Sequence, residues 1–130
     1  MAYLRFRRVC TVLFCALLLA LFRLPQQKLK NDAARWTEIL QNAKAALLDG
    51  DTVRAQAECD ALVTSFRAEE EALERFLNHD IVHAVLSDLR QAKALANAGD
   101  RSGAILALTA AESDIEQMLC IEQFTWNALL

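Results

Sequence analysis

Proline and glycine are scarce in this sequence, with one proline and three glycines among 130 residues. A β-sheet protein of this length needs many turns, and these two residues supply most of the special turn conformations. Their scarcity therefore argues against a many-stranded fold. Ala, Leu, Glu and Gln, which favour helices, are common instead. Because 55% of the residues are hydrophobic, the chain can bury a core, and we expect an all-α protein.

Acidic residues are absent from residues 1–30, which hold six basic side chains. Residues 31–130 hold eight basic and all 17 acidic residues, so their net charge is −9. Such asymmetry is typical of a membrane-contacting end joined to a solvated acidic body. The acidic body also argues against a nucleic-acid partner, because phosphate contacts require clustered Lys and Arg.

An uncharged apolar run covers residues 9–22, directly after a basic cluster at residues 5–8. Its 14 residues would extend ~21 Å as a helix, which is less than the ~30 Å of a hydrocarbon core. A cleaved signal peptide and a buried soluble helix are therefore alternatives to a membrane span. Cleavage after Ala20 would place the bulky Leu18 where a small residue is needed, which favours an uncleaved anchor.

We accordingly predict a signal anchor or transmembrane segment over residues 1–25, contacting membrane lipid through residues 9–22. A helical domain would follow over residues 26–130. The basic cluster before the apolar run is denser than the one after it, which favours a cytoplasmic N-terminus. We therefore expect a single-pass protein of the cell membrane whose helical domain lies outside the cytoplasm.

Apolar residues after position 25 recur at spacings of three and four, which predicts helices. The expected helices cover about residues 28–49, 52–77 and 81–97, with a fourth from about residue 101 to the end. Pro25 is expected to break or kink the chain between the anchor and the first of these. The expected core-facing positions are Leu29, Ala33, Trp36, Leu40, Ala43, Leu47, Val53, Leu62, Phe66, Leu73, Phe76, Leu77, Val82, Val85, Leu86, Leu89, Ala92, Ala96, Ala104, Ile105, Leu108, Ala111, Ile115, Met118, Leu119, Ile121, Phe124 and Ala128.

A Gly-Asp pair occurs twice, at residues 50–51 and 99–100, each after a helical stripe. Six of the 12 positions from 40 to 51 are identical to those 49 residues later. Gly is suited to end a helix and Asp to begin the next. We predict two antiparallel hairpins, over about residues 28–77 and 80–130, packed as a four-helix array. Similar composition of two Ala/Leu-rich helices is the alternative explanation for the repeat.

Several features occur in a characteristic order along nearly the whole chain. They are the charged start, the short apolar run, Trp36, Gly50-Asp51, residues 76–80, Leu89, Gly99-Asp100 with Ala104, and Phe124 followed by residues 127–129. In this order the chain resembles a bacterial family of small membrane-anchored helical proteins, the domain-of-unknown-function family four-three-six-three. Its most distinctive part is the Phe-x-x-His-Asp stretch. The resemblance implies an anchored helical domain and carries no established activity or catalytic residues.

His79 and His83 are four residues apart, with Asp80 between them. On a helix these two imidazoles share a face and can approach one metal ion. A stable site needs further ligands, and the local sequence supplies only Asp80. The alternative is an ordinary helix start, in which Asn78 or Asp80 is the N-cap.

The four cysteines form no C-x-x-C pair, so neither a zinc motif nor a dithiol motif is present. Cys59 and Cys120 fall on the second and fourth expected helices. An extracytoplasmic location would permit a disulfide between them. The alternative is that both act as small buried hydrophobic residues.

Two further groups are candidates for interaction. Trp126 and Leu130 point away from the face formed by the apolar residues of the last expected turns, so they are candidates for a partner or dimer contact. The acidic cluster at residues 69–71 and 74 can hold a cation or face a basic partner, although a solvated helix face is the commoner role of such a cluster.

The sequence contains no G-x-S-x-G elbow and no phosphate-cradling glycine loop, so we expect no enzyme activity and no cofactor. The leading hypothesis is a non-catalytic protein-protein interaction module with an unknown protein partner, or with a second copy of itself. The alternative hypothesis is a ligand- or cation-sensing helical domain.

Overall fold

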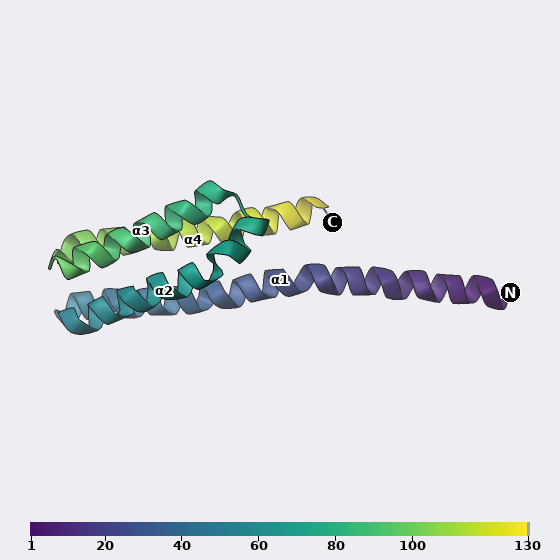
Figure 1. Cartoon of the computed structure of the whole chain (residues 1–130), viewed down its shortest axis with the longest axis horizontal. Helices are drawn as coiled ribbons and strands as arrows, with labels where there is room; N and C mark the ends of the chain where they lie inside the picture. Colours follow the sequence, from purple (N-terminus) through teal and green to yellow (C-terminus); the bar gives the residue numbers. More distant parts are fainter. Residues whose placement is uncertain (130) are drawn as a thin grey trace. The chain divides into compact units, whose positions relative to one another are not determined.

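The computed structural model describes the backbone of residues 1–129, and every side chain in that range except six. The six are Phe22, Pro25, Phe76, Thr125, Trp126 and Leu129. The described chain is all-helical, as the composition predicts, and contains four helices. They are α1 (Ala2–Asp49), α2 (Thr52–Phe76), α3 (His79–Asn97) and α4 (Arg101–Leu129) (Figure 1).

The chain divides into two compact units, Met1–Asp32 and Ala33–Leu130, and α1 contributes residues to both. The division between the compact units falls within α1, after Asp32. The helix also continues through Pro25, where a break or kink was expected. A proline removes one main-chain hydrogen bond, but the Leu, Gln and Lys residues around it favour helix.

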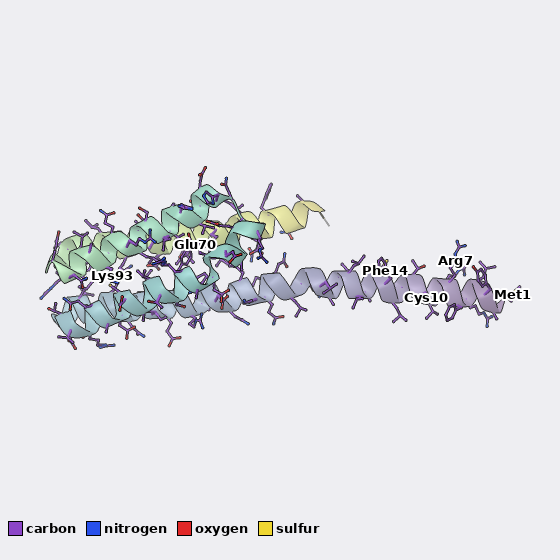
Figure 2. The ribbon with its side chains drawn as sticks, in the orientation of Figure 1. Met1, Arg7, Cys10, Phe14, Glu70 and Lys93 are labelled. Atoms are coloured by element: carbon purple, nitrogen blue, oxygen red, sulfur yellow. The ribbon has the colours of Figure 1, made fainter. Side chains whose placement is uncertain are left out.

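The first unit carries the apolar run. An 18-residue window of α1 has a mean hydropathy of 2.0 and contains no buried residue. The side chains of Arg7, Cys10 and Phe14 project outward from the helix (Figure 2), and Phe14 is 61% exposed. Among the described residues, α1 is the one helix that is long and apolar enough to cross a membrane.

The second unit is a four-helix bundle. Each helix contacts the next one along the chain, and α4 contacts α1. The contacts join Trp36 of α1 to Phe66 of α2, Asp60 of α2 to Lys93 of α3, Asp88 of α3 to Asp114 of α4, and Glu112 of α4 to Lys44 of α1. Trp36 and Phe66 have ring centroids 4.9 Å apart, and both side chains are fully buried.

The core of the bundle is apolar, and none of its described buried side chains is polar or charged. It includes most of the predicted positions, while Leu77, Ile105 and Leu119 are only partly buried. The largest fully buried side chains are Trp36, Phe66, Leu40, Leu62, Leu89, Leu108, Ile115, Met118, Val82, Val85 and Cys59. Val53 was expected among them but is 78% exposed. It lies in the first turn of α2, where the chain has only just left the turn that joins α1 to α2.

The last turns of α4 also differ from the expectation. Ile121, Phe124 and Ala128 were expected to face the core, yet all three are exposed, and Phe124 is 75% exposed. The reason is length. The two helices meet at the Gly99-Asp100 turn, and α4 has 29 residues whereas α3 has 19. About ten residues of α4 therefore extend beyond the start of α3, and periodicity alone does not reveal where this overhang begins.

The two Gly-Asp turns have the same geometry. Gly50 and Gly99 have φ angles of +77° and +80°, a left-handed conformation that glycine adopts without strain. The N–H of Asp51 donates to the carbonyl of Ala46 at 3.0 Å, and that of Asp100 donates to the carbonyl of Leu95 at 2.9 Å. These bonds close the helix ends in the manner of a Schellman motif.

Both aspartates then cap the following helix. Asp51 Oδ1 accepts a hydrogen bond from the N–H of Arg54 at 3.2 Å, and Asp100 Oδ1 accepts one from the N–H of Gly103 at 2.9 Å. The predicted stop-and-start role of the Gly-Asp pair is therefore present in both places.

Candidate metal centre

The junction between α2 and α3 is short and well capped. Only Leu77 and Asn78 separate the two helices. The N–H of Leu77 donates to the carbonyl of Leu73 at 2.8 Å, which ends α2. Asn78 Oδ1 accepts from the N–H of Asp80 at 2.9 Å, which caps α3. The last turn of α2 and the first turn of α3 are thus brought close together.

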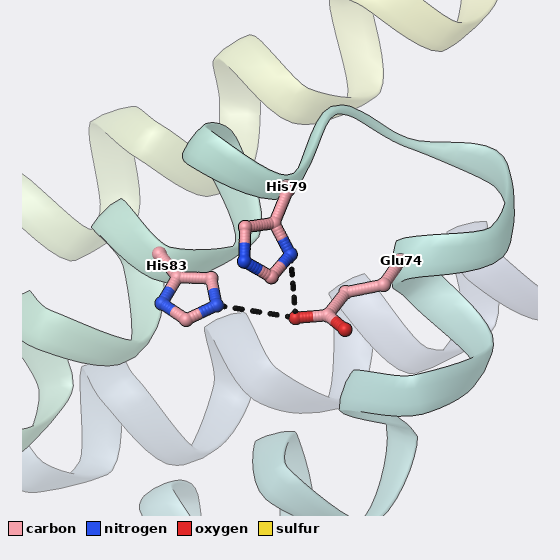
Figure 3. A group of neighbouring side chains, drawn as sticks. All are labelled: Glu74, His79 and His83. Atoms are coloured by element: carbon pink, nitrogen blue, oxygen red, sulfur yellow. Dashed lines mark hydrogen bonds and ion pairs between the residues drawn. The ribbon is translucent and has the colours of Figure 1, made fainter.

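Three side chains meet at this junction (Figure 3). One oxygen, Oε1 of Glu74, lies 3.1 Å from Nδ1 of His79 and 3.2 Å from Nε2 of His83. The two imidazole rings have centroids 4.0 Å apart and are tilted by 46°. The three ligand atoms all lie within 4.8 Å of one another. Among the described side chains, this is the one group of at least three His, Cys, Asp or Glu residues arranged closely enough to hold a metal ion.

The group lies at the surface of the bundle. The side chains of His79, His83 and Glu74 are 65%, 51% and 29% exposed. Solvent therefore reaches the ligand atoms, and an ion can enter and keep water as a further ligand.

The structure brings together two of the three predicted metal-ligand candidates. His79 and His83 share one face of α3, as their spacing predicts. Asp80 does not join them: it is exposed, and its main-chain N–H binds Asn78. The third member is Glu74, from the preceding helix. The sequence pattern assigns Glu74 to the acidic cluster of α2, although it lies only five residues before His79, on the other side of the turn.

The rest of the acidic cluster does not contribute ligands. Glu71 pairs with Arg75 at 3.1 Å, and both side chains are largely exposed. Glu70 is partly exposed and lies outside the group of three. An exposed i,i+4 pair of this kind is worth ~0.2–0.5 kcal/mol, so this part of α2 is a solvated face.

The two cysteines of the bundle have different surroundings. Cys59 is fully buried, and burial raises the pKa of its thiol, with the nearby charge of Glu58 raising it further. Cys120 is exposed. Both thiols are free in the structure, and a disulfide between them stays a prediction.

The predicted contact pair, Trp126 and Leu130, lies outside the described residues: the side chain of Trp126 and the whole of Leu130 are not described. A hollow of about 70 Å³ lies at the Gly-Asp end of the bundle. It is lined by Leu47, Gly50, Thr52, Ala96, Gly99 and Arg101. Organic ligands occupy pockets of roughly 300–1,000 Å³, so this hollow is too small for one.

Comparison of the chain with family models, with curated proteins and with solved structures finds no match. The resemblance to the family four-three-six-three therefore stays a prediction from the sequence.

Proposed function

We propose that this protein is a membrane-anchored, non-catalytic helical domain that acts by binding another protein. The observation that carries the proposal is the contrast between its two units. The apolar window of α1 has no buried residue, whereas the bundle has an apolar core in which no described side chain is polar. An apolar segment left exposed to this extent needs a lipid or protein environment. An apolar core stabilises a folded surface to which a partner can bind. No described buried side chain in it is polar or charged, so the core holds no group suited to binding a polar ligand.

The membrane assignment rests on the first unit. The basic residues before the apolar run favour a cytoplasmic N-terminus, which would place the bundle outside the cytoplasm. The anchor would keep the bundle close to other proteins of the same membrane. Confinement of this kind raises the effective concentration of a partner, so that a small interface suffices.

The projecting turns of α4 are the surface best suited to a partner. Ile121 and Phe124 are three residues apart, so they lie on the same side of the helix, and both are exposed. Aromatic side chains are enriched at the centres of protein interfaces because they bury a large area with few rotatable bonds. We therefore propose that an apolar surface of another membrane protein covers Phe124.

The arrangement of the bundle as two repeated hairpins belongs to the same proposal. Two identical Gly-Asp turns and the matching lysines at 44 and 93 support it. One hairpin would comprise α2 with the bundle part of α1, and the other would comprise α3 with α4.

Site-specific photo-crosslinking in native membranes tests the partner proposal. A photoreactive amino acid at position 124 should give one discrete crosslinked product, and the same residue at the exposed position of Arg67 on α2 should not. Phe124→Ser combined with a photoreactive residue at Ile121 should abolish the product. Equal yields at both positions, or no product at position 124, would refute the proposal. A product of twice the chain mass would identify the partner as a second copy.

A further inference from the structure

We propose that Glu74, His79 and His83 form a binding site for a divalent transition-metal ion, with Zn²⁺ as the best match. This site is separate from the partner surface proposed above and does not depend on it. Its ligands are two imidazole nitrogens and one carboxylate oxygen, contributed by two successive helices.

The distances fit a tetrahedral ion. When each ligand atom is 2.0–2.1 Å from zinc, neighbouring ligand atoms lie ~3.4 Å apart. Oε1 of Glu74 lies 3.1 Å from one imidazole nitrogen and 3.2 Å from the other. Both separations are within about 0.3 Å of the tetrahedral value. The two imidazole nitrogens lie within 4.8 Å of each other, so side-chain rotations that bring them closer would complete the ligand set.

The ligand types select the class of metal. Neutral imidazole nitrogen suits Zn²⁺, Cu²⁺, Ni²⁺ and Co²⁺, whereas Ca²⁺ and Mg²⁺ require mostly oxygen ligands. Two histidines and one glutamate make a known zinc ligand set in which the fourth position is held by water. The exposure of His79 and His83 leaves room for that water.

The three ligands come from two successive helices, so a bound ion should change the stability of the fold. His79 and His83 are fixed relative to each other by one turn of α3, and Glu74 belongs to the last turn of α2. A bound ion would therefore join the end of one helix to the start of the next. Since the ion binds the folded arrangement and not the unfolded chain, binding should raise the unfolding temperature.

The same contacts also fit a simpler arrangement, in which each imidazole N–H donates a hydrogen bond to Glu74. In that arrangement the ring nitrogens keep their protons. In the metal site these two nitrogens bind the ion through their lone pairs, and each neutral imidazole carries its proton on the other ring nitrogen. The two arrangements therefore differ in whether added metal binds in a saturable way.

The test uses the full-length protein in detergent micelles, treated with a chelator, with Cys10, Cys15 and Cys120 replaced by serine. These thiols are exposed and would compete for zinc. Calorimetric titration with ZnCl₂ should show one ion per chain. Glu74→Gln, His79→Ala and His83→Ala should each lower the affinity at least about tenfold. Glu70→Gln, which changes a carboxylate outside the group, should leave the affinity unchanged and serves as the matched control.

A second measurement uses the protein with all three proposed ligand residues unchanged. The chain has only two histidines, so its imidazole proton signals are assignable, and both should shift on titration with Zn²⁺. Co²⁺ should give the visible absorption of a tetrahedral complex. The proposal is overturned if zinc binds without saturation, if neither imidazole signal moves, or if His79→Ala and His83→Ala bind zinc as tightly as the parent while circular dichroism shows them folded.

Discussion

The indole N–H of Trp36 donates a hydrogen bond to Oγ of Ser65 at 3.1 Å, across the contact between α1 and α2. Trp36 is fully buried, and Ser65 is the polar partner that satisfies its ring nitrogen. The guanidinium of Arg35 also donates to the same oxygen at 3.1 Å. One small hydroxyl thus makes it possible to bury the largest side chain of the core.

Ser65→Ala should lower the free energy of unfolding by about 1–2 kcal/mol, because it leaves the buried indole N–H without a partner. Urea denaturation of the solubilised protein measures this change. Ser87→Ala, at an exposed position inside α3, is the control for the better helix propensity of alanine. Trp36→Phe should cost less in the Ser65→Ala background than in the parent, because the indole N–H is already without its partner there. Equal stability of Ser65→Ala and Ser87→Ala would contradict the role given to this hydrogen bond.

Gly50 and Gly99 have left-handed backbone conformations, so substitutions at these positions should lower the stability by graded amounts. Gly99 has φ +80° and no other atom within 4 Å of an added Cβ, so Gly99→Ala introduces backbone strain alone. It should cost about 1–2 kcal/mol. Gly99→Asn should cost less, because asparagine tolerates this conformation. Gly50→Ala adds a contact 3.0 Å from the Arg101 guanidinium, so it should cost at least as much. Thermal unfolding ranks the three variants, and a Gly99→Ala variant as stable as the parent would show that the turn adopts another conformation.

Asp114 should make the stability of the bundle depend on pH. Burial, a hydrogen bond with Asp88 and the charge of Asp88 raise the pKa of Asp114 from 3.8 to about 6. The folded chain therefore holds this proton more tightly than the unfolded chain. The resulting stabilisation is complete below pH 3.8 and is lost as the pH rises toward about 6.

Asp114→Asn should remove this dependence, since an amide keeps the hydrogen bond to Asp88 without a charge. At pH 7 the variant should be more stable than the parent by about 1 kcal/mol or less, because solvent screens a partly exposed carboxyl. Unfolding midpoints at pH 4, 5, 6 and 7 measure the effect. Glu116→Gln, at an exposed position of the same helix, should leave the pH profile unchanged. A parent profile that is flat between pH 4 and 6 would contradict the pairing.

The location of the bundle is accessible to a labelling experiment in intact cells. Glu70→Cys, with the four native cysteines replaced, should react with a membrane-impermeant maleimide if the bundle lies outside the cytoplasm. A matched Thr109→Cys variant, on the exposed side of α4, should behave in the same way. Labelling of both positions only after cell lysis would instead place the bundle in the cytoplasm.

Much of the bundle could be predicted from the sequence, because strong local signals mark where its helices end and begin. The Gly-Asp pairs set two turns, and apolar spacing identifies the core around Trp36 and Leu89. Two expectations were wrong for different reasons. Pro25 does not end α1, because the residues around it favour helix. Phe124 is exposed because it lies on a turn that extends past the neighbouring helix, and the sequence pattern does not contain this tertiary relationship.

The candidate metal centre could be predicted only in part for a similar reason. Helical spacing pairs His79 with His83. Glu74 joins them only because a two-residue junction folds α2 back toward α3, and the spacing of residues within one helix contains no information about that reversal. Asp80, which is adjacent in sequence, lies outside the group for the same geometrical reason.

Two lysines at matching positions of the sequence each bind a carboxylate from the other side of the Leu77-Asn78 junction: Lys44 of α1 binds Glu112 of α4, and Lys93 of α3 binds Asp60 of α2. Neither half therefore contains the counter-charge for its own lysine. These two ion pairs and the apolar core join the two halves through contacts that do not depend on the covalent link at Leu77-Asn78. If that peptide link were cut, the two fragments would still be complementary, and they should reassemble into one folded unit.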